Sequence, residues 1–277
     1  MEHGALLPNG RHLLIQSEVI WRYLRLFVAP FGQTIRHAVP AEPTWRAWLA
    51  AAGLLALAAA AWLARRKAPA VSFGALWFFA FILPSSAVPL LEQMAEHRVY
   101  EASAGLFAIA AIAIARLPRA AWAPVNVALL AALSIATVAR NRVWADPIRL
   151  WQEAARAAPN DWGPRYALGD AYRERGDCER AAVEYAAALA LRPTEARPHV
   201  NRGICLAQLG RPDEAEAEFR AALALFPRSA MVNHDLGTLA AGRDRLDEAR
   251  RYFQRALEID PDYAPARAAL ADLDSRR

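Results

Sequence analysis

The sequence predicts an all-α protein with about four transmembrane helices and an interfacial helix, followed by an α-solenoid of paired helices. Four long apolar runs lie between residues 45 and 139, and after them proline recurs every 34 residues from Pro159 to Pro261. The charge divides at the same place: residues 1–145 carry a net +7 and residues 146–277 a net −2, which together give the chain's +5. A length of 277 residues accommodates two such domains.

The composition excludes several classes of protein. Hydrophobic residues make up 56% of the chain and charged residues 22%, a balance that excludes a disordered tail. The length of 277 residues excludes a small disulfide-stapled fold. The positive net charge does not indicate nucleic-acid binding, because the basic excess lies at the ends of the apolar runs and the polar half lacks the basic surface that phosphate contacts need. No nucleic-acid partner is therefore expected.

The first transmembrane span is expected at residues 45–64. These residues contain a single charge, and at about 1.5 Å per residue they cross the roughly 30 Å hydrocarbon layer. A basic run at 65–67 follows them. Tryptophans lie near both ends of the span, where interfacial aromatic side chains belong: Trp45, Trp48 and Trp62.

Three further spans are expected, at about residues 70–91, 100–116 and 120–139. Pro84 and Pro89 predict a kink or a broken last turn in the first of these three. Glu101 and Ser103 shorten the apolar part of the next one. With its loops, the expected transmembrane domain covers residues 45–142.

The short loops predict the orientation. The loop after the first span is basic, as is the loop with Arg116 and Arg119, whereas the loop between the second and third spans has Arg98 against three glutamates. The positive-inside rule then places the polar half outside the cytoplasm, although Arg140 and Arg142 act in the opposite sense. Abundant arginine and alanine with a single lysine suggest a bacterium. We therefore expect a multi-pass protein of the bacterial inner membrane with a periplasmic C-terminal domain.

Residues 1–44 form an amphipathic N-terminal segment without the pattern of a cleavable signal peptide. Within residues 13–31, Glu18, Arg22 and Arg25 recur at helical spacing. They lie opposite an apolar face formed by Leu14, Val19, Tyr23 and Phe27. This pattern favours a helix lying in the membrane interface. The alternative is a fifth, polar span packed against the others.

The polar half contains an internal repeat. The 34-residue spacing of the prolines also links an aromatic, an alanine and a glycine position: Trp151, Tyr185, Phe219 and Phe253; Ala154, Ala188, Ala222 and Ala256; Gly169, Gly203 and Gly237. Each unit is predicted to be two helices. The small residue lets the paired helices approach, the aromatic residue fills the gap between units, and the proline closes the second helix.

This pattern resembles the tetratricopeptide repeat (TPR). The resemblance predicts a domain at 146–277 with three full repeats, at 162–195, 196–229 and 230–263. Residues 146–159 resemble the second helix of a preceding half-repeat, and residues 264–277 a polar helix that caps the exposed end.

The resemblance also implies a groove, formed by the first helix of each unit, that binds protein or peptide. Its expected lining residues are Tyr166, Asp170, Arg173, Val200, Asn201, Ile204, Gln208, His234 and Thr238. The basic clamp with which some TPR domains hold a C-terminal carboxylate is missing, since this half has no lysine. Asn201 fits a position that anchors a ligand backbone.

Metal and cofactor chemistry is not indicated. The six histidines show no paired ligand spacing, so no metal site is expected. The acidic triplet at 260–262 is interpreted as an inter-repeat turn, with proline closing one helix and aspartate capping the next. Cys178 and Cys205 are expected to be buried free thiols, although their positions in consecutive helices leave a disulfide open as the alternative.

The loop before the third span is the strongest candidate for chemistry. It combines Glu96, His97, Arg98 and Tyr100 at the expected outer surface. Arg98 has the paired N–H donors to hold a lipid phosphate, and His97 or Glu96 the groups for proton transfer. The alternative is that Glu96 and Arg98 form interfacial ion pairs that anchor helix ends.

Several segments together resemble a known enzyme family. The stretches at 13–40, 77–105 and 140–160 are similar to the C-terminal half of the transmembrane and TPR-containing, O-mannosyltransferase-like glycosyltransferases of the glycosyltransferase-C superfamily. The resemblance implies a polyprenyl-phosphate sugar as donor substrate, protein hydroxyl groups as acceptors and reaction on the outer side of the membrane. It also implies that Gln16, Glu96, His97 and Arg98 line the donor-lipid side of a cavity.

The departure from that family decides the functional hypothesis. Its catalytic acidic residues lie in the first outer loop of additional N-terminal spans, and nothing before Leu13 supplies them. We therefore expect a membrane-anchored TPR protein that binds polypeptide and is not catalytic alone, with membrane lipid as its other partner. The alternatives are a functional part of a polyprenyl-phosphate-sugar-dependent protein O-glycosyltransferase, and a TPR scaffold for envelope assembly.

Overall fold

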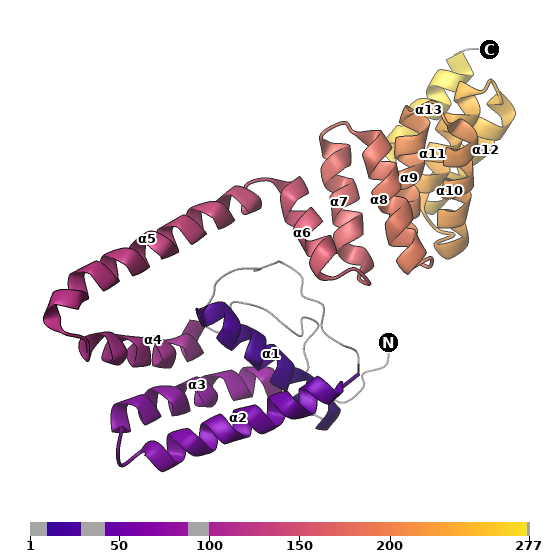
Figure 1. Cartoon of the computed structure of the whole chain (residues 1–277). Helices are drawn as coiled ribbons and strands as arrows, with labels where there is room; N and C mark the ends of the chain where they lie inside the picture. Colours follow the sequence, from indigo (N-terminus) through magenta and orange to yellow (C-terminus); the bar gives the residue numbers. More distant parts are fainter. Residues whose placement is uncertain (1–9, 29–41, 88–99, 276–277) are drawn as a thin grey trace. The chain divides into compact units, whose positions relative to one another are not determined.

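A computed structural model describes residues 10–28, 42–87 and 100–275, which form thirteen helices and no strand (Figure 1). The chain divides into two compact units, Met1–Ala145 and Asp146–Arg277. The all-α fold class expected from the sequence is confirmed for these residues.

The N-terminal unit contains five helices: α1 (Gly10–Val28), α2 (Trp45–Ala64), α3 (Pro69–Ala87), α4 (Tyr100–Ala115) and α5 (Arg119–Trp144). Among the described residues, α2 and α5 are long and apolar enough to cross a membrane, while α3 and α4 are shorter apolar helices. Helix α2 has the bounds expected from the sequence. Helix α5 continues past the expected end at 139, so Arg140 and Arg142 lie on its last turns. Pro84 lies inside α3.

Helix α1 packs against its neighbours through the apolar face that its sequence predicts. Val19, Ile20 and Tyr23 are buried in a cluster with Leu54 of α2, Phe78 and Ile82 of α3, and Ala102 of α4. Ser17 Oγ donates to Ala47 O at 2.8 Å, and Trp21 Nε1 donates to Ala50 O at 2.9 Å. The apolar face therefore covers protein, as in the alternative of a polar helix packed against the others. Its depth in a membrane stays a prediction.

Helices α3 and α4 touch through their backbones. A Cβ atom added to Gly74 would lie 2.5 Å from Gly105 O, and one added to Gly105 would lie 2.1 Å from Gly74 O. Next to this crossing, Trp77 Nε1 donates to Glu101 O at 3.1 Å. Small residues at a helix crossing are typical of association in lipid, where close packing rather than hydrophobic burial holds helices together.

The C-terminal unit is a succession of helix pairs (Figure 1). Its helices are α6 (Pro147–Ala157), α7 (Trp162–Glu174), α8 (Cys178–Leu191), α9 (Ala196–Gln208), α10 (Pro212–Leu225), α11 (Ala230–Gly242), α12 (Leu246–Ile259) and α13 (Ala264–Ser275). Side chains of Asp146, Asp161, Asp177 and Ser229 cap four of these helices. Gly176, Gly210 and Asp244 take positive φ angles at equivalent turns, 34 residues apart.

The repeating glycine and aromatic residues pack within each pair. A Cβ atom on Gly169, Gly203 or Gly237 would lie 2.6 to 2.7 Å from the ring of Tyr185, Phe219 or Phe253, respectively. Each ring is buried, with at most 2% exposure. The aromatic residue was expected to fill the gap between units; it packs on the glycine of its own pair, and Phe219 also shares a core cluster with Val232 and Leu236 of the next pair. The glycine allows the two helices to approach because it leaves room for this ring.

Candidate functional site

The groove residues expected from the sequence lie on three first helices. Tyr166, Asp170 and Arg173 are on α7, Val200, Asn201, Ile204 and Gln208 on α9, and His234 and Thr238 on α11. Hydrogen bonds join α7 to α9, so the two helices present one continuous polar surface.

Asp170 is the centre of a hydrogen-bond network on α7. Its Oδ1 accepts from Tyr185 OH at 2.6 Å and from Asn201 Nδ2 at 2.8 Å, and it lies 4.0 Å from Arg173 Nε. Burial, reinforced by Asp170, raises the pKa values of Tyr166 and Tyr185. Both phenols therefore remain protonated donors throughout the physiological range.

Asn201 links the two first helices. Its amide nitrogen donates to Asp170 and also to Tyr166 OH, at 3.1 Å. The sequence indicated that Asn201 anchors a ligand backbone. Both amide hydrogens are engaged within the protein, so Asn201 joins α7 to α9, and its role toward a ligand stays a prediction.

Sequence reasoning missed an aromatic and cationic edge beside this network. The guanidinium of Arg197 lies 5.3 Å from the ring centroid of Tyr166 and 5.9 Å from that of Trp162. Such cation–π contacts hold the exposed Arg197 against the aromatic rings. In the sequence, the indication that Arg197 belongs to this surface is its position one helical turn before Asn201.

Along α9 and α11, this surface has more apolar side chains than it has around Asp170. Val200 is buried and Ile204 is half-buried. On α11, the ring of His234 lies 5.6 Å from Phe253 and 5.7 Å from Tyr263, centroid to centroid. Thr238 is exposed, and its hydroxyl donates to its own helix at His234 O.

Gln208 is tied to the first cysteine. Its Oε1 accepts from Cys178 Sγ at 2.9 Å, although its side chain was expected to line the groove. Cys178 and Cys205 are free and buried, as the favoured sequence hypothesis has it, and they share one core cluster. Burial, followed by the hydrogen bond with Cys178, raises the pKa of Cys205 to about 12.

These thiols are expected to be unreactive in the folded protein. At pH 8, the native chain should liberate almost no thionitrobenzoate from Ellman's reagent, because both sulfur atoms are buried and Cys205 stays protonated. After unfolding in denaturant, the chain should liberate two equivalents of thionitrobenzoate. Rapid native labelling would contradict the packing, and absent labelling after denaturation would show that the two residues had formed a disulfide.

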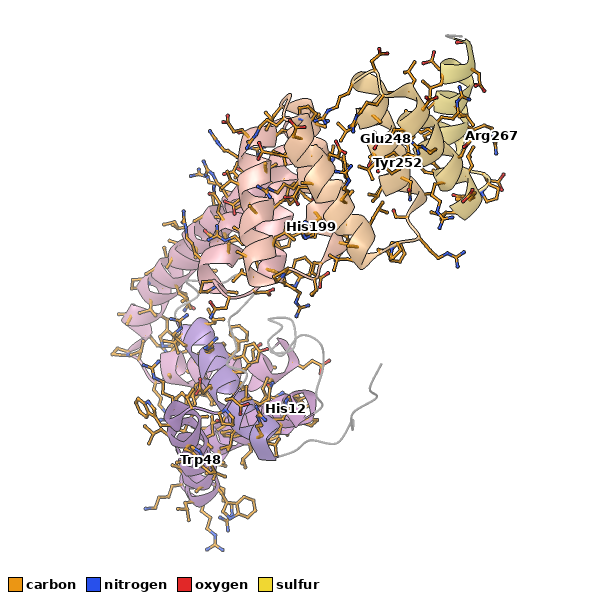
Figure 2. The ribbon with its side chains drawn as sticks, turned by 90° about the vertical axis from the view of Figure 1, so that its right-hand side faces the viewer. His12, Trp48, His199, Glu248, Tyr252 and Arg267 are labelled. Atoms are coloured by element: carbon orange, nitrogen blue, oxygen red, sulfur yellow. The ribbon has the colours of Figure 1, made fainter. Side chains whose placement is uncertain are left out.

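A second surface varies from one helix pair to the next. Arg165 pairs with Glu184 at 3.0 Å, and 34 residues later His199 contacts Glu218 at 2.6 Å. The next pair has Asn233 and Tyr252 at these positions. A hollow of about 360 Å³ opens there, lined by Asn233, Glu248, Arg251, Tyr252 and Arg255. Figure 2 labels Glu248 and Tyr252.

Glu216 on α10 is the most heavily paired acid that sequence reasoning missed. Its side chain, 8% exposed, contacts Arg220 of its own helix, and its Oε2 accepts from Arg243 at 2.9 Å and Arg245 at 2.8 Å. The hydrogen bond from Arg245, with the charges of the other two arginines, holds the pKa of Glu216 below its usual value despite burial. This network joins one helix pair to the turn of the next.

The stability of the chain should therefore fall in acid in a way that depends on Glu216. Because the folded pKa is depressed, this stabilisation is present above the unfolded pKa of roughly 4.3 and is lost as the pH falls through the folded pKa. In Glu216→Gln, the melting temperature should therefore fall less between neutral and acidic pH than it does in the wild type. The control Asp213→Asn removes a 92% exposed carboxylate and should leave the profile unchanged. Identical profiles for Glu216→Gln and the wild type would contradict this role.

Of the expected donor-lipid residues, Gln16 and Tyr100 lie within the described ranges, and the donor-lipid role stays a prediction. Gln16 is buried in α1, at 3% exposure. Glu96, His97 and Arg98 lie outside the described residues, and Tyr100 is the first residue of α4. Across the ranges 10–28, 42–87 and 100–275, no group of three or more His, Cys, Asp and Glu side chains could hold a metal ion.

Comparisons with known proteins match the C-terminal unit. Family models described as "Tetratricopeptide repeat" and "TPR repeat" match residues 194–262 and 169–210. No curated protein matches the chain. Solved structures with similarity include MamA from Desulfovibrio magneticus RS-1, at 27% identity and a TM-score of 0.45, covering 47% of this chain and 73% of that one.

Two further similar structures come from other organisms. TTC0263, a TPR protein of Thermus thermophilus, is 28% identical with a TM-score of 0.41, covering 46% of this chain and 70% of that one. The second TPR domain of human RPAP3, solved with an HSP70 peptide, is 23% identical with a TM-score of 0.39, covering 40% of this chain and 92% of that one.

Proposed function

We propose that this TPR-type helical repeat protein binds polypeptide along the first helices of its repeats and is held at a membrane by its N-terminal unit. The observation that carries the binding function is the surface of α7, α9 and α11, where polar and aromatic side chains are half-buried and held in place by hydrogen bonds. A rigid surface of this kind loses little conformational entropy when it binds an extended chain. Solenoid repeats use such surfaces for binding.

The exposed apolar side chains of α2 and α5 support a membrane anchor. No residue of α5 is buried, and Leu55, Leu130 and Ile135 are 72%, 64% and 71% exposed. Apolar surface of this extent is unfavourable in water and favourable in lipid.

Arginine and tryptophan at the helix ends fit the membrane–water interface. The guanidinium of Arg65 lies 4.2 Å from the ring centroid of Trp62 at the end of α2, and that of Arg140 lies 5.6 Å from Trp144 at the end of α5. Amphipathic aromatic rings and cationic side chains favour the lipid headgroup region. We propose that α2 to α5 span the membrane and that the three helix pairs from α7 to α12 are complete TPR repeats outside the cytoplasm.

The proposed orientation predicts the behaviour of reporter fusions in a bacterial host. Alkaline phosphatase fused after Arg277 should be active and green fluorescent protein dark at that site, because phosphatase folds only outside the cytoplasm. Fusions after Lys67 should show the reverse pattern, since the basic loop at 65–67 is expected in the cytoplasm. Equal phosphatase activity at both sites, or the opposite pattern, would contradict the topology.

The sugar-transfer and envelope-scaffold alternatives rest on the sequence resemblance and on the repeats alone. The matched family models begin at residue 169, and the loop that contains Arg98 lies outside the described residues. We propose no catalytic step for this chain.

The binding function is tested by photo-cross-linking from the exposed Thr238 on α11, with the exposed Val183 on α8 as the matched position.

A further inference from the structure

Two aspartates on the first helices have opposite environments. Asp170 accepts hydrogen bonds from Tyr185 and Asn201 and lies near Arg173. Asp235, on α11, has one oxygen (Oδ2) that is buried and has no hydrogen-bond partner within the described ranges. Its other oxygen lies 3.3 Å from Nδ1 of the neighbouring His234. A buried carboxylate oxygen without a donor is costly unless another group supplies one.

The repeat register explains why Oδ2 of Asp235 lacks a partner. It stands 34 residues after Asn201, which donates to the residues 35 and 31 positions before it, Tyr166 and Asp170. The same spacings from Asp235 lead to Val200 and Ile204, whose aliphatic side chains offer no donor. By this register, the positions that correspond to the partners of Asn201 are apolar for Asp235.

The surroundings of Asp235 are acidic and aromatic. Burial raises the pKa of Tyr263, and the carboxylates of Asp235 and Asp260 raise it further, so both acids act on this ring. The ring of Tyr263 lies edge-on to His234. Three arginines at this end of the solenoid are engaged with other groups: Arg267 donates to Pro261 O and pairs with Asp262, and Arg243 and Arg245 contact Glu216.

We propose that Asp235 receives a lysine or arginine side chain of the bound polypeptide. The inference rests on the proposed peptide-binding function and adds the chemical class of the ligand. The side chain of Asp235 is 21% exposed, so a donor on the surface of α11 can reach the carboxylate, and rotation about χ2 turns the buried Oδ2 toward that donor. The cation forms a charge-assisted hydrogen bond with the carboxylate, and its aliphatic stem packs on the half-buried Ile204. The polypeptide site thus selects a basic residue beside the aliphatic wall of α9.

An array of matched twelve-residue peptides tests the proposal with the full chain in lipid nanodiscs. Every member carries lysine, arginine, glutamine or glutamate at its central position and is otherwise unchanged. We expect the lysine and arginine versions to bind about tenfold more tightly than the glutamine versions, and the glutamate versions most weakly. Asp235→Asn should abolish this preference. The control Asp262→Asn removes a fully exposed carboxylate in the adjacent turn and should preserve the preference.

The stability of Asp235→Asn separates a binding role from a structural one. Because Oδ2 of Asp235 has no donor to lose, and an amide oxygen can keep the contact with His234 Nδ1, the isosteric amide should leave the melting temperature unchanged or higher. A lower melting temperature would overturn the inference, as would equal binding of lysine and glutamine peptides by the wild type. Equal binding leaves the proposed peptide-binding function intact. Absence of all peptide binding also overturns the inference, and cross-linking from Thr238 then decides the proposed function independently.

Discussion

Replacing Gly105 by valine is expected to separate helices α3 and α4 and to unfold the N-terminal unit. A Cβ atom at this position would lie 2.1 Å from the carbonyl oxygen of Gly74 and 3.1 Å from Trp77 Cβ. Backbone atoms cannot rotate away as a side chain can, so the helices must move apart. The cost should be at least about 3 kcal/mol, the upper part of the range for overpacking. Tryptophan fluorescence of the detergent-solubilised protein during heating measures the thermal midpoint of unfolding.

The matched control lies next to it on the same helix. Ala104 is exposed, so Ala104→Val adds a β-branched side chain to α4 without a clash. It should shift the thermal midpoint only slightly. Equal midpoints for the two variants would show that α3 and α4 do not cross at Gly74 and Gly105.

Replacing Gly237 by alanine is expected to destabilise the C-terminal unit, although alanine is the better helix former. The added methyl group would lie 2.6 Å from the ring of Phe253, which is 2% exposed and has no free space into which to move. Overpacking should cost about 1–3 kcal/mol, more than the ~1 kcal/mol gained in helix propensity. Chemical denaturation followed by circular dichroism at 222 nm measures the difference.

The same helix contains the control for this prediction. Gly242, at the end of α11, has nothing within 4 Å of an added Cβ atom. Gly242→Ala should therefore be neutral or stabilising. Opposite signs for the two substitutions support the packing of ring on glycine, and equal signs would contradict it.

Periodicity explains why so much of the C-terminal unit follows from the sequence. One spacing of 34 residues fixes the helix pairs, because each periodic proline follows the end of a second helix and glycine recurs where a ring must fit. Gly169, Gly203 and Gly237 lie where the register predicts, each against a buried ring. In the N-terminal unit, the length of an apolar run predicts α2 well, whereas the polar end of α5 continues its helix beyond the apolar run.

Side-chain partners within the site could not be predicted in this way. The hydrogen bonds of Asn201 and the cluster around Glu216 depend on how neighbouring repeats pack, which the spacing of one residue type does not encode. Gln208 has the right position for the groove, but the thiol of Cys178 competes for its amide oxygen. A comparison of equivalent positions, such as Asn201 with Asp235, is the signal that distinguishes one repeat from the next.

The two halves of the proposed function support each other physically. A groove that is tethered to a membrane samples the volume near the bilayer surface, which raises the effective concentration of polypeptides held in the same membrane. Modest affinity at Asp235 and the aromatic edge at Arg197 then suffices for selection of a partner.

Site-specific photo-cross-linking in living cells tests the central claim most directly. Benzoylphenylalanine is placed at Thr238 in the groove or at Val183, which is 64% exposed on α8, in the full-length chain. We predict discrete polypeptide adducts from Thr238 that are absent from Val183 and that Asp235→Asn diminishes. Equal yields of adducts from the two positions would contradict polypeptide binding on the first helices. The absence of adducts from Thr238 in a folded chain would contradict it as well.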